Sequence, residues 1–170
     1  MKDGYELGFA VNYLSHLALT LELLPLLESS APARIVNVTS IGQQEIDWDD
    51  LMLERRYDGF RSYAQSKLAQ VMFTFELAER LGTDSGVTVD AVHPASLMDT
   101  KMVRDSFGRS RTTVDEGADA VIHVLDDRNG SGRYFEGKRE RRALGQAYDR
   151  EARKRLWGLS EELTGVRAPL

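Results

Sequence analysis

Tyr63 and Lys67 form the pair of side chains in this sequence best suited to proton transfer. Residues four apart share one face of a helix, so the ammonium of Lys67 would lie beside the hydroxyl of Tyr63. A phenol has an ordinary pKa of about 10, and an ammonium in a partly dry cleft favours its ionised form. A tyrosine tuned in this way can donate or accept a proton, so the pair is a candidate general acid–base.

Two further polar residues are placed where they could support the same chemistry. Ser40 ends the β-branched run 34–40, and Tyr63 opens the helix after the next loop. In an open α/β sheet both positions lie at the carboxyl edge, where ligands bind. A serine there can hydrogen-bond a substrate oxygen; alternatively, it satisfies loop amides at the end of the strand. Asn12 lies within an apolar helix and needs a partner, either a backbone group or an ordered water.

A parallel sheet with flanking helices would position these residues, and the hydrophobic pattern predicts one. Segments of helical and strand character alternate along the chain, as in α/β folds. We predict helices over residues 7–27, 63–81, 113–125 and 146–163 and strands over residues 34–40, 87–92 and 131–135. Two long irregular connections, at 42–60 and 95–112, have the length typical of functional loops.

The first predicted helix has apolar residues on more than one side. One face is formed by Leu7, Val11, Leu14, Ala18, Leu21 and Leu24, and further apolar area by Phe9, Leu19, Leu23, Leu26 and Leu27. The second side either contacts neighbouring helices or forms an oligomer interface. We expect a homo-oligomer through the helices at 6–28 and 63–81. Polar residues interrupt the apolar run, so we expect no membrane span.

Composition excludes several classes of protein. With 170 residues, 42% hydrophobic and 29% charged, the chain fits one globular domain. Its 22 basic and 27 acidic residues give a net charge of −5, which leaves no basic surplus for nucleic acid. The chain has no cysteine, and its three histidines lack ligand-like spacing, so we expect no metal site. His16 and His123 are interpreted as packing or surface residues. A cytoplasmic location is expected, with no secretory signal at the start.

Motifs in consistent order along the chain resemble the short-chain dehydrogenase/reductases, and within them the retinol-dehydrogenase-like type. The matching segments are 9–16, which carries Asn12; 34–40, which ends in Ser40; 63–69, which contains Tyr63-x-x-x-Lys67; 92–95; and the terminal segments 131–135, 146–149 and 156–160. Residues 92–95 resemble the family's Pro-Gly turn, with Ala95 in place of the usual glycine. The resemblance covers nearly the whole chain.

The resemblance implies a catalytic role for four residues. Tyr63 would transfer the proton, and Lys67 would tune its hydroxyl and hold the nicotinamide ribose. Ser40 would orient the substrate oxygen, and Asn12 would anchor a water in a proton relay. The implied reaction interconverts a small-molecule carbonyl and an alcohol by hydride transfer.

The resemblance also implies that NADP or NAD is the cofactor. Tyr63 and Lys67 would contact it together with Pro94, Ala95 and Thr100, of which Thr100 would bind the carboxamide. The loop from Ser96 to Ser110 would form the substrate lid. Thr100 lies one residue further from Pro94 than is commonest in the family.

The glycine-rich turn that dinucleotides need at a helix N-terminus is absent from this sequence. Its only Gly-x-Gly, Gly130-Ser131-Gly132, has Phe135 where the pattern requires the third glycine. We therefore expect residues 1–170 to form a single partial domain, the C-terminal half of a Rossmann-like doubly wound parallel sheet with three α/β/α layers. Such a chain would be inactive alone. The alternative is a noncatalytic truncated remnant that acts at most as a self-associating interaction module.

Overall fold

The computed structural model describes residues 4–169, apart from the side chains of Met102, Ser106 and Phe107. In that part of the chain the strands form one four-stranded sheet of order β1-β2-β3-β4. The strands are β1 (Ala33–Val38), β2 (Val87–His93), β3 (Tyr134–Glu136) and β4 (Arg139–Arg141). β1, β2 and β3 are parallel, and β4 returns antiparallel to β3. Among the described residues, β1 pairs along one edge only.

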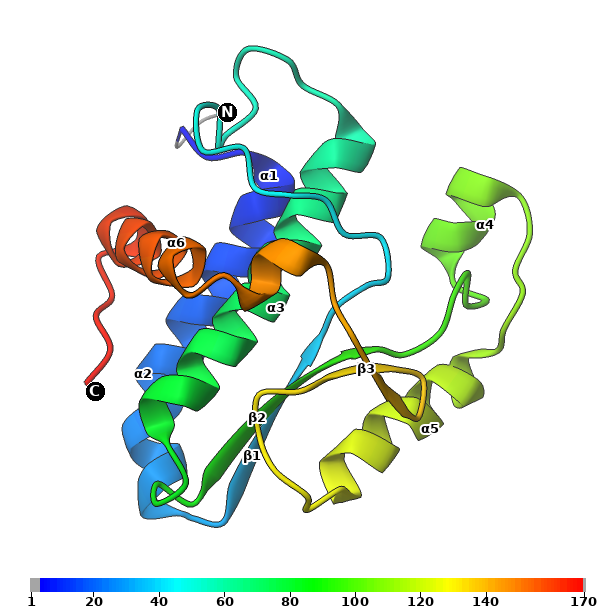
Figure 1. Cartoon of the computed structure of the whole chain (residues 1–170). Helices are drawn as coiled ribbons and strands as arrows, with labels where there is room; N and C mark the ends of the chain where they lie inside the picture. The colour runs from blue at the N-terminus through cyan, green and yellow to red at the C-terminus, as the bar shows by residue number, and fades with distance from the viewer. Residues whose placement is uncertain (1–3, 170) are drawn as a thin grey trace.

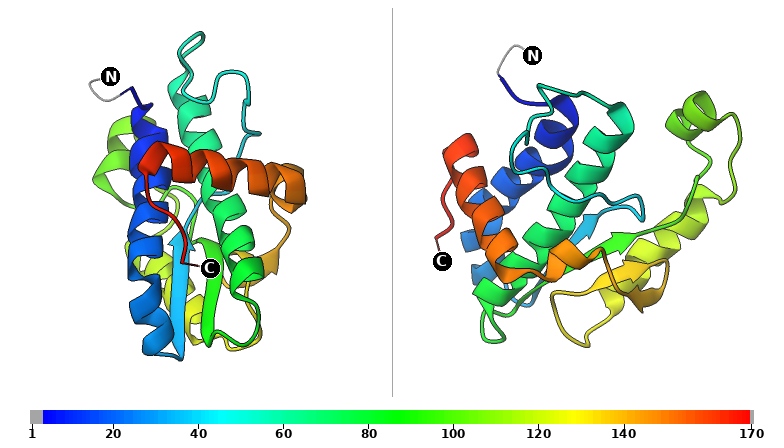
Figure 2. Two further views of the ribbon diagram at one scale, coloured as in Figure 1. Left: turned by 90° about the vertical axis from the view of Figure 1, so that its left-hand side faces the viewer. Right: turned by 45° about the horizontal axis from the view of Figure 1, so that its top comes forward.

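Helices cover both faces of this sheet (Figure 1). One face carries α1 (Leu7–Phe9), η1 (Ala10–Leu14), α2 (Ser15–Ser29) and α3 (Gly59–Leu81), and the other carries α5 (Val114–Asp126). The remaining helices are α4 (Lys101–Phe107), η2 (Gly145–Tyr148) and α6 (Arg150–Thr164). α6 crosses the outer side of the first helical layer (Figure 2). The predicted fold class, a Rossmann-like parallel sheet in three α/β/α layers, is confirmed.

The end of the sheet differs from the sequence prediction. β3 begins at Tyr134 rather than at 131, because Gly130 and Gly132 adopt positive φ angles of 126° and 77° and form a turn. β4 was not predicted, since all three of its residues are charged and exposed and show no apolar alternation. A short turn through Gly137, with φ 59°, joins the two strands into a hairpin.

Helix boundaries also differ in places. α3 begins at Gly59 rather than at 63, because the Asp58 side chain accepts the Arg61 N–H and caps the helix. The predicted loop 95–112 contains a short helix, α4. It begins after Thr100, whose side chain caps it, and it ends at Gly108 with φ 68°. Capping residues set these boundaries more sharply than the apolar pattern does.

The buried face of the first helix matches its predicted spacing at Leu14, Leu21 and Leu24 but differs at the start of the helix. Leu7 and Val11 are 68% and 56% exposed, whereas Phe9 and Tyr13 are buried. The cause is the π-helical turn η1, which places more residues in a turn than an α-helix does and rotates what precedes it. After this turn, α2 buries Leu17, Leu21 and Leu24 against the core.

α3 is the central helix, and α6 seals its outer side. Phe73 of α3 stacks on Trp157 of α6 with ring centroids 5.7 Å apart. The charged run 150–155 has the sequence of a solvated helix face, but Arg153 within it is only 6% exposed. Its guanidinium pairs with Glu76 at 3.3 Å and also with Glu79. α3 is therefore largely covered within this chain. Of the two helices predicted to form an oligomer interface, α2 is the one that exposes leucines.

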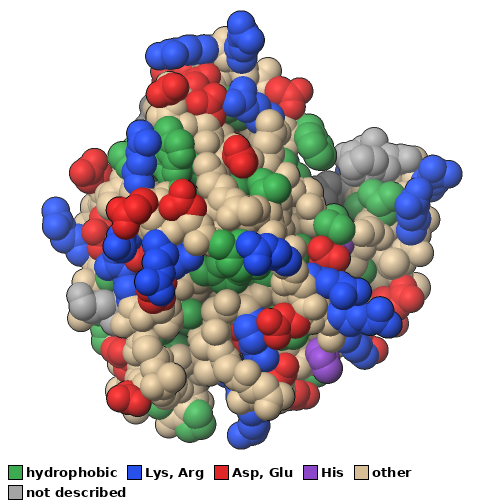
Figure 3. All heavy atoms as spheres, viewed as in Figure 1, with side chains coloured by type: hydrophobic (Ala, Val, Ile, Leu, Met, Phe, Trp, Pro, Cys, Tyr) green, Lys and Arg blue, Asp and Glu red, His purple; other side chains and the backbone are tan. Residues whose placement is uncertain are grey.

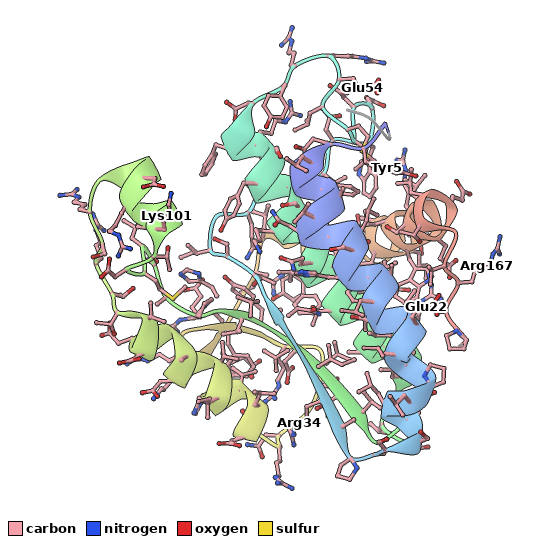
Figure 4. The ribbon with its side chains drawn as sticks, turned by 180° about the vertical axis from the view of Figure 1, so that it is seen from behind. Tyr5, Glu22, Arg34, Glu54, Lys101 and Arg167 are labelled. Atoms are coloured by element: carbon pink, nitrogen blue, oxygen red, sulfur yellow. The ribbon has the colours of Figure 1, made fainter. Side chains whose placement is uncertain are left out.

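Charged side chains of both signs are interspersed over the face seen in Figure 3. On the opposite side, α2 runs along the surface with Glu22 on its outer side (Figure 4). Within the described residues, the continuous helical segment Leu7–Ser29 is long and apolar enough to cross a membrane. Core helices of soluble proteins meet the same criterion, and this one packs one side into the core. The absence of a membrane span stays a prediction.

Candidate active site

Ser40 and Tyr63 converge at the carboxyl edge of β1. Ser40 lies just beyond the end of the strand, and its Oγ accepts the backbone N–H of Gly42 at 3.0 Å. The Tyr134 hydroxyl donates to the Ser40 carbonyl at 3.3 Å. A Cβ placed on Gly42 would lie 3.5 Å from Ser40 Oγ and 3.6 Å from Tyr63 Cε1. The two side chains predicted to act on one substrate oxygen therefore flank the same small volume.

Lys67 lies one turn further along α3. Its Nζ is 5.8 Å from the centroid of the Tyr63 ring. It donates to the Val38 carbonyl at 3.1 Å and to Gln70 Oε1 at 2.8 Å. Burial lowers the pKa of Lys67 to about 8, because the charged form is disfavoured away from water. The site thus combines a phenol with a partly buried amine that releases its proton more readily than an ordinary lysine.

Asn12 lies in the middle of the π-helical turn and contacts the start of α3. Its Nδ2 donates to Ser66 Oγ at 3.0 Å, and Ser66 donates to the Tyr63 carbonyl at 2.7 Å. The helices come close here, since a Cβ on Gly8 would lie 2.5 Å from Ser62 Oγ. The partner of Asn12 is therefore the side chain of Ser66, which is neither of the two partners expected from the sequence, a backbone group or an ordered water. This link joins η1 to the backbone of Tyr63.

The other residues predicted to contact the cofactor, Pro94, Ala95 and Thr100, lie at the end of β2 and in the loop that follows it. Pro94 is buried and Ala95 is half-buried at the end of the strand. Thr100 caps α4, with Oγ1 accepting the N–H of Val103 at 3.3 Å. Among the described residues, no hydrogen bond joins Thr100 to Ser40 or Lys67.

The predicted lid is a closed loop with α4 at its tip. Its base is joined by two backbone hydrogen bonds of 2.9 Å, from Asp99 to Thr112 and from Arg111 to Leu97. Leu97 has a φ of 52°, a strained value for a residue with a side chain, and such strain is common at functional sites. α4, marked by Lys101 in Figure 4, stands apart from the end of α3 that carries Tyr63. The loop is thus anchored at its base and extended at its tip.

Three residues at the site were missed by the sequence analysis. Ser66 and Gln70 each lie three residues after a predicted site residue on α3, and this spacing could have identified them. His16 was interpreted as a packing or surface residue, but its Nδ1 lies 2.6 Å from Gln70 Nε2. No local pattern signals this contact, because it joins two helices that are distant in sequence.

The comparison with known families agrees with this arrangement. A family model described as short chain dehydrogenase matches residues 2–110. The fold, the order of the motifs and this match define the class of protein. The chain belongs to the short-chain dehydrogenase family.

Particular relatives refine this assignment. Human retinol dehydrogenase 13 is 38% identical over 196 residues, which cover 99% of this chain and 56% of that protein. The chain therefore spans about half the length of the curated relatives it matches. The structure of an uncharacterised protein from Mycobacterium paratuberculosis has a TM-score of 0.78 and 31% identity, over 99% of this chain and 62% of that one. NADPH-bound carbonyl reductase from chicken fatty liver has a TM-score of 0.63 and 27% identity, over 80% and 53%.

The residues present fit one end of a nicotinamide dinucleotide. Lys67 uses two of its three N–H groups on protein acceptors among the described residues, which leaves one for a ribose hydroxyl. Tyr63 lies beside it at the open edge of the sheet. No residues here fit the pyrophosphate, because the sequence lacks the glycine turn that would hold it. The described residues thus place Ser40, Tyr63 and Lys67 together at one edge of the sheet and offer no glycine turn for the phosphates.

The depressed pKa of Lys67 predicts a pH dependence of stability. The unfolded chain, with an ordinary lysine pKa near 10.5, holds more protons than the folded chain between about pH 8 and 10.5. The free energy of unfolding should therefore rise with pH in that window, by about 1 kcal/mol from Lys67 after allowance for its partial exposure. Urea denaturation at about pH 8 and about pH 9.5, below the ordinary tyrosine pKa, measures this rise. The Lys67→Met variant should lack it, and equal rises in both proteins would refute the assignment.

Proposed function

We propose that this chain carries the substrate side of an NAD(P)-dependent oxidoreductase site that interconverts a carbonyl and an alcohol. The observation that carries the proposal is the convergence of Ser40 and Tyr63 on one point beside Gly42, with the Lys67 amine 5.8 Å from the tyrosine ring. Membership of the short-chain dehydrogenase family supports it. The chemical class of the substrate is a small molecule with a carbonyl or hydroxyl group.

The protein side chains would handle the oxygen and its proton. Ser40 Oγ accepts a bond from Gly42, and among the described residues its own O–H has no acceptor, so it can donate to a substrate oxygen. Tyr63 would give its proton to that oxygen in reduction and take it back in oxidation. Lys67 would favour the ionised phenol by its charge and bind the ribose, and Asn12 would hold a relay water. A bound nicotinamide dinucleotide supplies or accepts the hydride.

The cofactor is proposed to be NADP or NAD, with reduction by NADPH as the preferred direction. The chicken carbonyl reductase of the same fold is bound to NADPH, which supports this direction. Pro94, Ala95 and Thr100 are proposed to contact the nicotinamide and its carboxamide. The Thr100 hydroxyl already caps α4, so contact with the carboxamide would require the same hydroxyl to bind the cofactor as well. A cytoplasmic location is proposed from the lack of cysteine.

A second candidate function, a noncatalytic self-associating module, is favoured by a different observation. The backbone of β1 is unpaired along one edge in the described part of the chain, and such edges recruit other strands. Leu19 and Leu26 on α2 are 61% and 62% exposed and extend the apolar surface. In this alternative the chain binds copies of itself and has no turnover.

The catalytic proposal predicts that activity depends on the missing phosphate turn and on Tyr63. The purified chain should consume no more NADPH with an aldehyde or ketone than its Tyr63→Phe variant does. Fusion to the upstream half of a full-length relative, such as human retinol dehydrogenase 13, should restore turnover. Tyr63→Phe in the fusion should lower kcat by at least about 100-fold, the scale of one proton-transfer group. A folded, NADPH-binding fusion without turnover would contradict the proposal, and robust turnover by the chain alone would contradict its inactivity.

The exposed surfaces predict that the isolated chain self-associates. Sedimentation velocity should show species larger than a monomer, and Leu19→Lys with Leu26→Lys should shift the distribution toward the monomer. A matched control is Ile122→Lys on the outer face of α5, which is exposed as well and should leave the distribution unchanged. A monodisperse monomer for the unmodified chain would exclude the interface.

A further inference from the structure

Gln70 bridges Lys67 of α3 to His16 of α2. The Gln70 side chain is 1% exposed, with Oε1 2.8 Å from Lys67 Nζ and Nε2 2.6 Å from His16 Nδ1. An ammonium has donors only, so the amide oxygen must face Lys67 and the amide NH₂ must face the histidine. His16 Nδ1 is therefore an acceptor, and its ring carries its proton on Nε2.

We infer that Gln70 and His16 are positioning residues that hold the Lys67 amine in the candidate active site. The Lys67 amine donates one hydrogen bond to Gln70 Oε1 and a second, of 3.1 Å, to the Val38 carbonyl of β1. His16 in turn fixes the orientation of the Gln70 amide. The catalytic meaning of this role rests on the proposed function, but the three-residue contact itself does not.

The network can exist only while His16 is neutral. Burial and the nearby charge of Lys67 both lower the pKa of His16, in that order of size. A protonated His16 would have no acceptor for the Gln70 amide and would add a second positive charge near Lys67. Among the described residues, the titratable groups in contact with the network are Tyr63 and Lys67 on α3 and His16 on α2, and β1 contributes the neutral Val38 carbonyl.

Protonation of His16 and protonation of Lys67 should therefore oppose one another. Such coupling is reciprocal by thermodynamic necessity, so it can be measured from either residue. Acidification would break the bond between His16 and Gln70 and loosen the amide that holds Lys67. The coupling would give the site a lower pH limit set by a residue outside the proton-transfer pair.

Titration of His16 by NMR in the full chain tests this inference without any turnover. Lys67→Met should raise the pKa of His16, because a neighbouring positive charge is removed. Gln70→Glu, which keeps the size of the side chain, should raise it by about one unit by placing a carboxylate beside the ring. The same substitution should move the pKa of Lys67 above about 8, and the shift can be followed by NMR of ¹³C-labelled lysine in the unmodified side chain. A glutamine that contacted neither His16 nor Lys67 would produce neither shift.

His93 provides the internal control. Its Nε2 lies 3.0 Å from Ser96 Oγ, at the base of the lid, and its pKa is lowered by burial. Its titration should be unchanged in both variants if the fold is retained. An unchanged His16 pKa in both variants, with an unchanged His93, would overturn the inference. Because no step needs NADPH or substrate, that result is distinct from a failure of the catalytic proposal.

Discussion

The site depends on one structural constraint, the parallel pairing of β1 with β2 across the crossover helix α3. The register runs from Ala33 opposite Val87 to Val38 opposite Val92. Because the strands are parallel, the connection must return to the starting edge, and the loop after Ser40 leads into the first turns of α3 at the carboxyl edge. Ser40 and Tyr63 therefore meet although 22 residues separate them in the sequence.

Packing around α3 then fixes which way its side chains point. The sheet lies on one side of the helix, η1 and α2 on another, and α6 covers the outside through Trp157 and Arg153. A helix buried on several sides cannot rotate without opening cavities, each of which costs stability. Tyr63 and Lys67 are thereby held toward the strand edge. The π-helical turn that contains Asn12 interrupts the regular helix next to α3, and the Asn12 amide in it donates a hydrogen bond to Ser66.

The sequence predicted the parts of this site that follow from local pattern. The β-branched strand before Ser40, the helix with Tyr63 and Lys67, and their meeting at one edge are confirmed by the structure. The predicted apolar face of the first helix was wrong at Leu7 and Val11, because spacing assumes 3.6 residues per turn and the π-helical turn breaks that phase. The burial of Arg153 has no local signal in its charged run, since its ion pairs with Glu76 and Glu79 come from tertiary packing. The link from His16 to Gln70 had no local signal for the same reason.

The most direct test of the central claim is a single NMR contact in the isolated chain. If α3 is held as described, the ring protons of Tyr63 lie close to the α-protons of Gly42, since a Cβ there would be 3.6 Å from Tyr63 Cε1. We predict a nuclear Overhauser effect between these protons, lost when Tyr63 is replaced by leucine. Its absence in a chain whose Phe73–Trp157 contact is observed would show that the site is not assembled by these residues.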